Sequence, residues 1–259
     1  MKNTLYILLF LSALIYAQNP IETSLVTTSV FEAGDIINID NFGTTYFISD
    51  NVFSKTANDK TITYNNIQLG ELNAVNVFNP LKINLFYKDF NSVVVLDNRL
   101  AEIFKIDFNQ MTPYKNVTHI STGYDNTIWI FNQDTQRLEL FDYKTKTTRI
   151  QTIPIQSPVL DIKSNYNYCW VLTEKYLYKY NYFGILIMKI ENDGCNALAE
   201  SNENIILKKG NNLFYLRNSD DKPQAIKIPN LLINQFFVTN ETLYIYNNKT
   251  LHELQLKIK

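Results

Sequence analysis

The chain has 259 residues, of which 46% are hydrophobic and 14% aromatic, and its 24 basic residues nearly balance its 25 acidic residues to give a formal net charge of −1. So many apolar side chains argue against intrinsic disorder, and the balanced charge argues against nucleic acid as a partner because no basic field would attract a polyanion. Tyr and Phe are abundant, with 17 and 16 copies, while Gly and Pro have seven copies each, which favours pleated sheets over helices.

The first 17 residues have the features of a secretory signal peptide. Lys2 provides a basic start, an apolar stretch runs from Leu5 to Ile15, and Ala17 offers a small residue for cleavage. The apolar stretch is shorter than the roughly 20 residues needed to span a bilayer, and no later segment approaches that length. We therefore expect residues 1–17 to be removed on export and residues 18–259 to form one domain, in the periplasm, at the outer membrane or outside the cell.

After the signal peptide, the sequence predicts one isolated strand, Ile21 to Phe31, and then a repeated pattern. Each repeat has an apolar strand, a second apolar strand, a third alternating strand and a last strand ending in Ile or Phe, with polar turns between them. Equivalent first-strand positions recur at intervals of 38, 43, 42, 36 and 38 residues: Ile39, Val77, Ile120, Ile162, Leu198 and Phe236. The centres of the second strands keep step with them: Tyr46, Leu85, Trp129, Trp170, Ile206 and Tyr244.

The clearest repeat is the fourth. Its strands are expected at Val159 to Ile162, Tyr168 to Leu172, Tyr176 to Tyr180 and, after Gly184, Ile185 to Ile190. A period near 40 residues with four strands per repeat is typical of β-propeller blades, because one small antiparallel sheet buries its faces only against neighbouring sheets. The sequence therefore predicts an all-β fold, a six-bladed β-propeller, although the uneven period leaves five or seven blades open.

The two ends of the chain fit together in this interpretation. The sixth repeat offers strands at Ile233 to Val238, Thr242 to Tyr246 and Thr250 to Leu256, and it then stops without a fourth. The isolated segment from Ile21 to Phe31 can supply that missing strand and so remove a free sheet edge. We expect the propeller to be closed by an N-terminal strand that joins the last blade.

Two segments carry a resemblance to a known group of repeats. Tyr178 to Gly184 before Ile190, and Leu138 to Tyr143 before Ile150, each combine an alternating strand, a turn with Tyr, Asp or Gly and a final apolar strand. In this respect they resemble the NHL-type and quinoprotein-like propeller repeats, and the resemblance extends from Asp35 to Lys259. The chain departs from related repeats because it has no WD dipeptide and no kelch double glycine.

Few residues are available for catalysis. His119 and His252 are the only histidines, so one chain cannot build a three-histidine zinc site. The sequence also has no glycine-rich phosphate loop, no CxxC pair and no HExxH motif. We interpret His119 as a structural residue of a first strand and His252 as a surface or inter-blade residue.

A metal site is the first alternative. Oxygen ligands suit Ca²⁺, and some six-bladed propellers are metal-dependent lactonases. The equivalent turns of the fifth and sixth repeats carry Lys208 to Gly210 and Asn247 to Asn248 instead of acids, which breaks the ring. Solvated turn residues are thus the simpler interpretation, and no cofactor is expected. Four acidic residues near the second strands are the candidate ligands: Asp50, Asp89, Asp134 and Glu174.

An aromatic stretch in the fourth repeat is the second alternative. The residues alternate along two strands and could bind a glycan or a protein partner, because Tyr and Trp combine an apolar body with a polar tip. Packing between blades is the favoured interpretation, since aromatic strands are ordinary in all-β cores. The stretch comprises Tyr166, Tyr168, Trp170, Tyr176, Tyr178, Tyr180 and Tyr182. Export allows a disulfide between Cys169 and Cys195, and the sequence leaves this open because a buried free Cys behaves as a small hydrophobe.

Export, short loops and the missing catalytic motifs lead to one functional hypothesis. The protein is expected to be a non-catalytic propeller that acts as a protein-binding or scaffold module in the bacterial cell envelope. It is expected to hold an envelope protein partner and to associate with the membrane only through that partner. A metal-dependent propeller hydrolase or lactonase and a carbohydrate-binding propeller remain the alternatives.

Overall fold

A computed structural model describes residues 19–258, so the expected signal peptide lies outside the described residues. Within them the chain forms 24 β-strands and two short 3₁₀ helices, Ile67–Leu69 and Phe108–Gln110. The all-β composition predicted from the sequence is confirmed. None of the described helices has the length and apolar character needed to cross a membrane.

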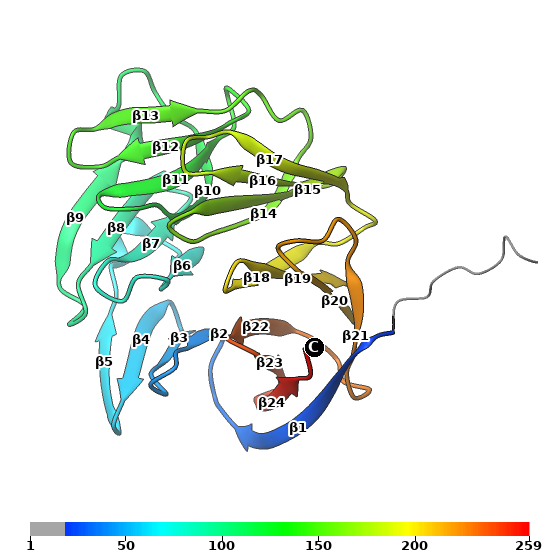
Figure 1. Ribbon diagram of the computed structural model, residues 1–259. Helices are drawn as coiled ribbons and strands as arrows, with labels where there is room; N and C mark the ends of the chain where they lie inside the picture. Colours follow the sequence, from blue (N-terminus) through cyan, green and yellow to red (C-terminus); the bar gives the residue numbers. More distant parts are fainter. Residues whose placement is uncertain (1–18, 259) are drawn as a thin grey trace, which may run out of the picture.

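Four sheets each contain four strands that follow one another in the chain and pair antiparallel with their neighbours. Figure 1 shows the sheets arranged around a common centre, with first strands such as β2, β6 and β14 facing inward. The first two sheets are β2 (Asp35–Ile39), β3 (Thr45–Ser49), β4 (Val52–Ala57) and β5 (Lys60–Tyr64), then β6 (Ala74–Asn76), β7 (Ile83–Tyr87), β8 (Ser92–Leu96) and β9 (Glu102–Asp107). The next two are β10 (Val117–Thr122), β11 (Thr127–Asn132), β12 (Arg137–Asp142) and β13 (Thr147–Gln151), then β14 (Val159–Ser164), β15 (Tyr168–Thr173), β16 (Tyr176–Asn181) and β17 (Leu186–Glu191).

The remaining strands form one eight-stranded sheet in the order β18-β19-β20-β21-β1-β24-β23-β22. Within it, β1 pairs in parallel with β21 only through Ile21 and Glu22, and it then pairs antiparallel with β24 from Thr23 to Val30. The pairing of the N-terminal segment with the last strand, predicted from the sequence, is therefore confirmed. The contact with β21 was not predicted. These strands are β1 (Ile21–Val30), β18 (Ala197–Ser201), β19 (Asn204–Lys209), β20 (Asn212–Leu216), β21 (Gln224–Lys227), β22 (Gln235–Thr239), β23 (Thr242–Asn247) and β24 (Thr250–Leu256).

Tight turns between strands use residues that tolerate a left-handed backbone. Asp50 and Asn51 both have positive φ, of 49° and 65°, as do Asn202 and Glu203, of 50° and 66°. Two successive positive φ values define the two-residue turn whose twist matches that of a hairpin, and Asn and Asp are among the residues that adopt it at least cost. The Asn-rich and Asp-rich turns of the sequence thus set the register of the hairpins they join.

Hydrophobic side chains between neighbouring sheets form the core. Trp129 on β11 packs with Val171 on β15, and Trp170, on the opposite face of β15, packs with Leu198 and Ile205 of the following sheet. Both tryptophans are only 1% exposed. Central strands such as β7 and β8 are buried at every position, because they are covered on both faces. Each sheet therefore depends on its two neighbours for its stability.

One buried polar network interrupts this apolar packing. The Lys115 ammonium lies 2.5 Å from Glu139 Oε2 and both side chains are buried. Asn132 Nδ2 donates to Glu139 Oε1 over 3.1 Å, and Thr148 Oγ1 donates to Oε2 over 2.8 Å. Burial alone raises the pKa of the Glu139 carboxyl, but the hydrogen bonds from Lys115, Thr148 and Asn132 outweigh it and leave the pKa below its ordinary value. The network joins the segment before β10 to β11, β12 and β13.

We predict that Lys115→Met destabilises the protein by about 3–5 kcal/mol, because it leaves the Glu139 carboxylate buried without its counter-charge. Lys105→Met, at an exposed position on β9, is the control and should change the free energy of unfolding by less than about 0.5 kcal/mol. Urea unfolding of the three proteins at neutral pH measures the difference. Equal stabilities of the two variants would contradict the role given to the buried pair.

Because the pKa of Glu139 is lower in the folded protein than in the unfolded chain, its ionised form stabilises the fold above the unfolded value of 4.5. This contribution is lost as the pH falls through the folded pKa. We predict that acidification below pH 4.5 destabilises the wild type more steeply than Glu139→Gln, with unfolding followed by circular dichroism. Parallel pH profiles for the two proteins would show that Glu139 is not responsible.

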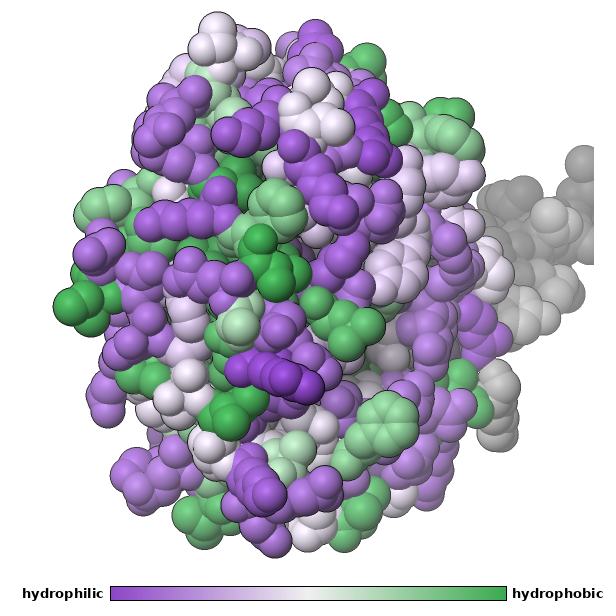
Figure 2. Space-filling view, turned by 90° about the vertical axis from the view of Figure 1, so that its left-hand side faces the viewer, coloured by the Kyte–Doolittle hydropathy of each residue, from purple (hydrophilic) through white to green (hydrophobic). Residues whose placement is uncertain are grey.

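Figure 2 shows the side of the molecule that lies at the left of Figure 1, where the outer strands β5 and β9 are found. Hydrophobic residues on this side are interspersed with hydrophilic ones and do not merge into one continuous patch. The exposed apolar side chains of these two strands are Ile62 and Ile103. Singly exposed residues of this kind are normal on a soluble surface and do not indicate a binding site.

Candidate functional site

First strands from five repeats line a cavity of about 490 Å³, which we call the central channel. The strands are β2, β6, β14, β18 and β22, and the lining also includes residues next to them and, from two second strands, Ile48 and Lys208. Its polar side chains carry both signs of charge, so the channel is not a simple anion or cation site. They include Asp35, Asn38, Asn76, Asp161, Lys163, Glu200, Lys208 and Gln235.

Hydrogen bonds between the first strands hold the wall of the channel. Asn76 Nδ2 donates to Ser121 Oγ over 3.1 Å, and Ser164 Oγ donates to the same oxygen over 2.7 Å. On the other side of the ring, Gln235 Oε1 accepts from the backbone N–H of Ile36 over 2.9 Å. Side chains that bridge neighbouring sheets in this way fix the positions of the polar groups facing the channel.

Asp161 and Lys163 of β14 line the channel, whereas His119 on the adjacent β10 lies near them without being part of the lining. Lys163 Nζ is 3.4 Å from Asp161 Oδ1, while Asp161 Oδ2 accepts from the backbone N–H of Leu198 over 3.0 Å. His119, on the adjacent β10, lies with its Nδ1 3.0 Å from Thr118 Oγ1. Burial lowers the pKa of His119, and the opposing effect of Asp161 is smaller. The imidazole is therefore neutral at pH 7 and able to accept a proton.

Glu200 is a second perturbed group in the channel. Burial raises the pKa of its carboxyl, although the carboxylate accepts from Asn165 Nδ2 and from the backbone N–H of Glu203, each over 2.9 Å. Lys179 lies nearby, and burial lowers the pKa of its ammonium. Its Nζ is 3.7 Å from the centre of the Tyr168 ring. Carboxyl groups with a raised pKa inside a cavity are candidates for proton transfer.

The acidic residues predicted as metal ligands do not come together. All four are exposed, none of them lines the channel, and each lies in the turn between the second and third strands of a different sheet. Those turns are one strand farther from the centre than the first strands, which explains why the expected ring does not form. Across residues 19–258, no group of three His, Cys, Asp or Glu side chains could hold a metal ion. The four residues are Asp50, Asp89, Asp134 and Glu174.

The aromatic stretch mostly packs between sheets. Trp170 and Tyr178 are buried in the two clusters on opposite faces of the fourth sheet. Tyr168 and Tyr176 are half-buried, and each is covered by a lysine, with Lys189 Nζ 3.9 Å from the centre of the Tyr176 ring. Tyr166 is 45% exposed and meets Phe78 edge-on at 4.9 Å. Little of the stretch is therefore available to a glycan or a partner.

Cys169 and Cys195 are free thiols, both buried, in separate hydrophobic clusters. The disulfide that the sequence left open does not form. Burial raises the pKa of both thiols, so they behave as packing residues and not as nucleophiles.

No protein-family model and no curated protein matches the chain. Among solved structures, it is similar to a catalytically inactive histidine-to-alanine variant of virginiamycin B lyase from Staphylococcus aureus, with quinupristin. The TM-score is 0.62 at 12% identity, over 94% of this chain and 97% of that chain. It is also similar to a streptogramin B lyase, with a TM-score of 0.61 at 11% identity over 89% and 98% of the two chains. A third is a chain of the mitotic checkpoint complex, with a TM-score of 0.59 at 12% identity over 90% and 74%.

These comparisons and the repeated four-stranded sheets define the class of the fold as a β-propeller. At 11–12% identity the likeness extends to the fold alone. The hypothesis of a non-catalytic scaffold is nevertheless wrong as an inference, because similar structures of this shape include lyases. It relied on missing local motifs, whereas a channel site is assembled from single residues of several sheets. Asp161, Lys163 and Glu200 were missed for this reason, although each is a charged residue within a first strand.

We predict that His119 titrates below its ordinary value of 6.5, as NMR of the imidazole protons will show in a His252→Gln variant that retains a single histidine. Removing the positive charge with Lys163→Gln should raise the pKa of His119, and removing the negative charge with Asp161→Asn should lower it. Unchanged titration in both variants would contradict the arrangement of this cluster.

Proposed function

We propose that this protein is a propeller enzyme of the lyase type, whose substrate enters the central channel and reacts beside His119. The observation that carries the proposal is the pair Asp161 and Lys163, which lines a cavity of about 490 Å³, together with the neutral imidazole of His119 on the adjacent strand, whose pKa both charges influence. That volume lies in the range of small-molecule sites. Similar structures that are lyases, one of them inactive as a histidine-to-alanine variant, support the proposal.

A lyase breaks a bond to carbon by elimination, in which a base removes a proton and the leaving group departs as a double bond forms. In this proposal His119 accepts the proton, since its imidazole is neutral. The Lys163 ammonium stabilises negative charge that develops on a carbonyl oxygen of the substrate. Asp161 holds that ammonium at 3.4 Å and is itself anchored by the N–H of Leu198. Glu200, with its raised pKa, is the candidate that returns a proton to the leaving group.

The proposal includes a six-bladed ring. The eight-stranded sheet divides naturally at β1, because only Ile21 and Glu22 pair with β21 whereas the remainder pairs with β24. The two halves, together with the four separate sheets, give six units of four strands. The strand and turn of the fourth unit, Tyr176–Asn181 followed by Gly184, support a relation to NHL-type repeats.

We place the enzyme outside the cytoplasm, on the strength of the basic and apolar N-terminal residues alone. One similar structure belongs to a protein complex, which supports an envelope protein as a partner for the outer faces of the ring. This partner is secondary to the proposal, which rests on the channel.

The direct test is incubation of the purified protein with a panel of quinupristin and close analogues of it, followed by liquid chromatography and mass spectrometry. We predict conversion to an elimination product with a new double bond, and a loss of at least about 100-fold in rate for His119→Ala, since general bases typically contribute 10²–10⁴-fold. His252→Ala is the matched control because its side chain lies on β24, hydrogen-bonded to Thr28. No turnover by folded wild type across the panel, or full activity of His119→Ala, would refute the assignment.

A further inference from the structure

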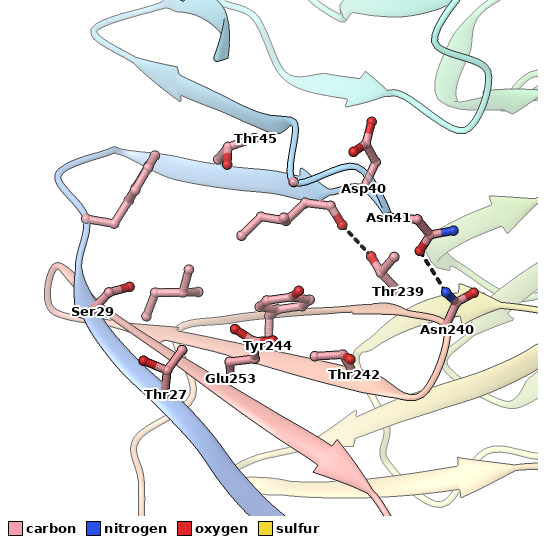
Figure 3. A pocket seen from close by; sticks show the side chains of 14 residues that line it. Thr27, Ser29, Asp40, Asn41, Thr45, Thr239, Asn240, Thr242, Tyr244 and Glu253 are labelled. Carbon is pink, nitrogen blue, oxygen red and sulfur yellow. Dashed lines mark hydrogen bonds between the residues drawn. The ribbon is translucent and has the colours of Figure 1, made fainter. Parts of the chain in front are cut away.

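A second cavity lies where the ring closes, between the last strands of the chain and the first sheet. Its volume is about 580 Å³ and residues of β1, β2, β3, β23 and β24 line it. We call it the closure cleft (Figure 3). It is separate from the central channel, and the two share no lining residue.

The cleft exists because hydrophobic packing is thin at this junction. The cluster that joins the last sheet to the first contains five buried residues, whereas the other clusters of the described chain contain between eight and twelve. At the inner end the two walls are tied together, since Thr239 Oγ1 donates to the Ile39 carbonyl over 2.6 Å and Asn240 Nδ2 donates to Asn41 Oδ1 over 2.7 Å. Farther out, Thr45 and Thr27 lie on opposite walls (Figure 3).

Polar side chains line both walls. On the first sheet the lining hydroxyl is Thr45, which lies opposite Thr56, and Thr56 lies opposite Thr61 outside the cleft. Thr56 and Thr61 are joined by a hydroxyl hydrogen bond of 2.8 Å. The facing wall adds Thr27, Ser29 and Thr242. Larger clusters of hydrophobic residues fill the junctions of the first, second and third sheets.

The floor and the charges of the cleft narrow the choice of ligand. Tyr244, Glu253 and Thr27 are directly opposite one another on three paired strands, so they form one row across the wall. The Tyr244 ring stacks on Phe237 at 4.7 Å and is held in place. Asp40 Oδ1 accepts hydrogen bonds from the backbone N–H groups of Phe42 and Thr44. The described lining contains two carboxylates, Asp40 and Glu253, and no basic residue, which disfavours an anion.

We propose that the closure cleft binds a neutral saccharide. Closely spaced hydroxyls that donate and accept, and an acceptor carboxylate at Glu253, complement the alternating hydroxyls of a sugar. This site is additional to the channel and requires no catalytic step. In the lyase proposed above, such a site holds the enzyme on a glycan surface while the channel remains free.

The experiment is isothermal titration of the full mature chain with neutral oligosaccharides of glucose, galactose and N-acetylglucosamine. Sialylated oligosaccharides and a trilysine peptide serve as anionic and cationic comparators. We expect at least one neutral oligosaccharide to bind and the anionic sugars to bind more weakly. Thr27→Val and Thr242→Val should each weaken binding by about fivefold, the worth of one neutral hydrogen bond.

Valine keeps the shape and the strand preference of threonine, so these variants are expected to fold, as thermal unfolding will verify. Thr147→Val, at an exposed strand position of the third sheet, is the matched control and should leave the affinity unchanged. His119→Ala should also bind saccharide normally, which separates this proposal from the one for the channel. Absence of binding by every neutral oligosaccharide, wild-type affinity in both Thr27→Val and Thr242→Val, or preference for trilysine would overturn it.

Discussion

Pairing of β1 with β24 is the interaction on which the ring depends. It joins Thr28 to His252, which are 224 positions apart in the chain. Each sheet buries its faces only against its neighbours, so an open ring would leave the first and last sheets with one uncovered face each. The seven paired positions from Thr23 to Val30 hold the ends of the chain together and thereby preserve every junction between them.

The order of the strands could be predicted from the sequence because apolar strand positions recur with a regular period. The positions around Trp129 and Trp170 are apolar in step with the other repeats, and both proved to be buried second-strand residues. Because the last repeat lacks a fourth strand, it could be predicted as the partner of the segment from Ile21 to Phe31. The contact of Ile21 with β21 could not be foreseen, because two residues of pairing leave no pattern in the sequence.

The site was harder to predict because its residues are not adjacent in the chain. Asp161 and Lys163 resemble any polar pair in a strand until the topology brings His119 beside them. Asp50, Asp89, Asp134 and Glu174 satisfied the expected chemistry but lie one strand too far from the centre. Sequence periodicity therefore located the sheets well, whereas the groups facing the channel depend on how the sheets are turned around the axis.

The shared position of β1 has a consequence for how the chain matures. A hairpin within one sheet can form as soon as its own residues are available, but β1 has to wait for β24, the last strand of the described chain. Until synthesis is complete, the edge of β1 that carries Leu25 and Val26 lacks its partner and can pair wrongly. Closing so large a loop is slow compared with forming a local hairpin, so the pairing of β1 with β24 limits the rate of folding. A chaperone would be most useful before this pairing forms.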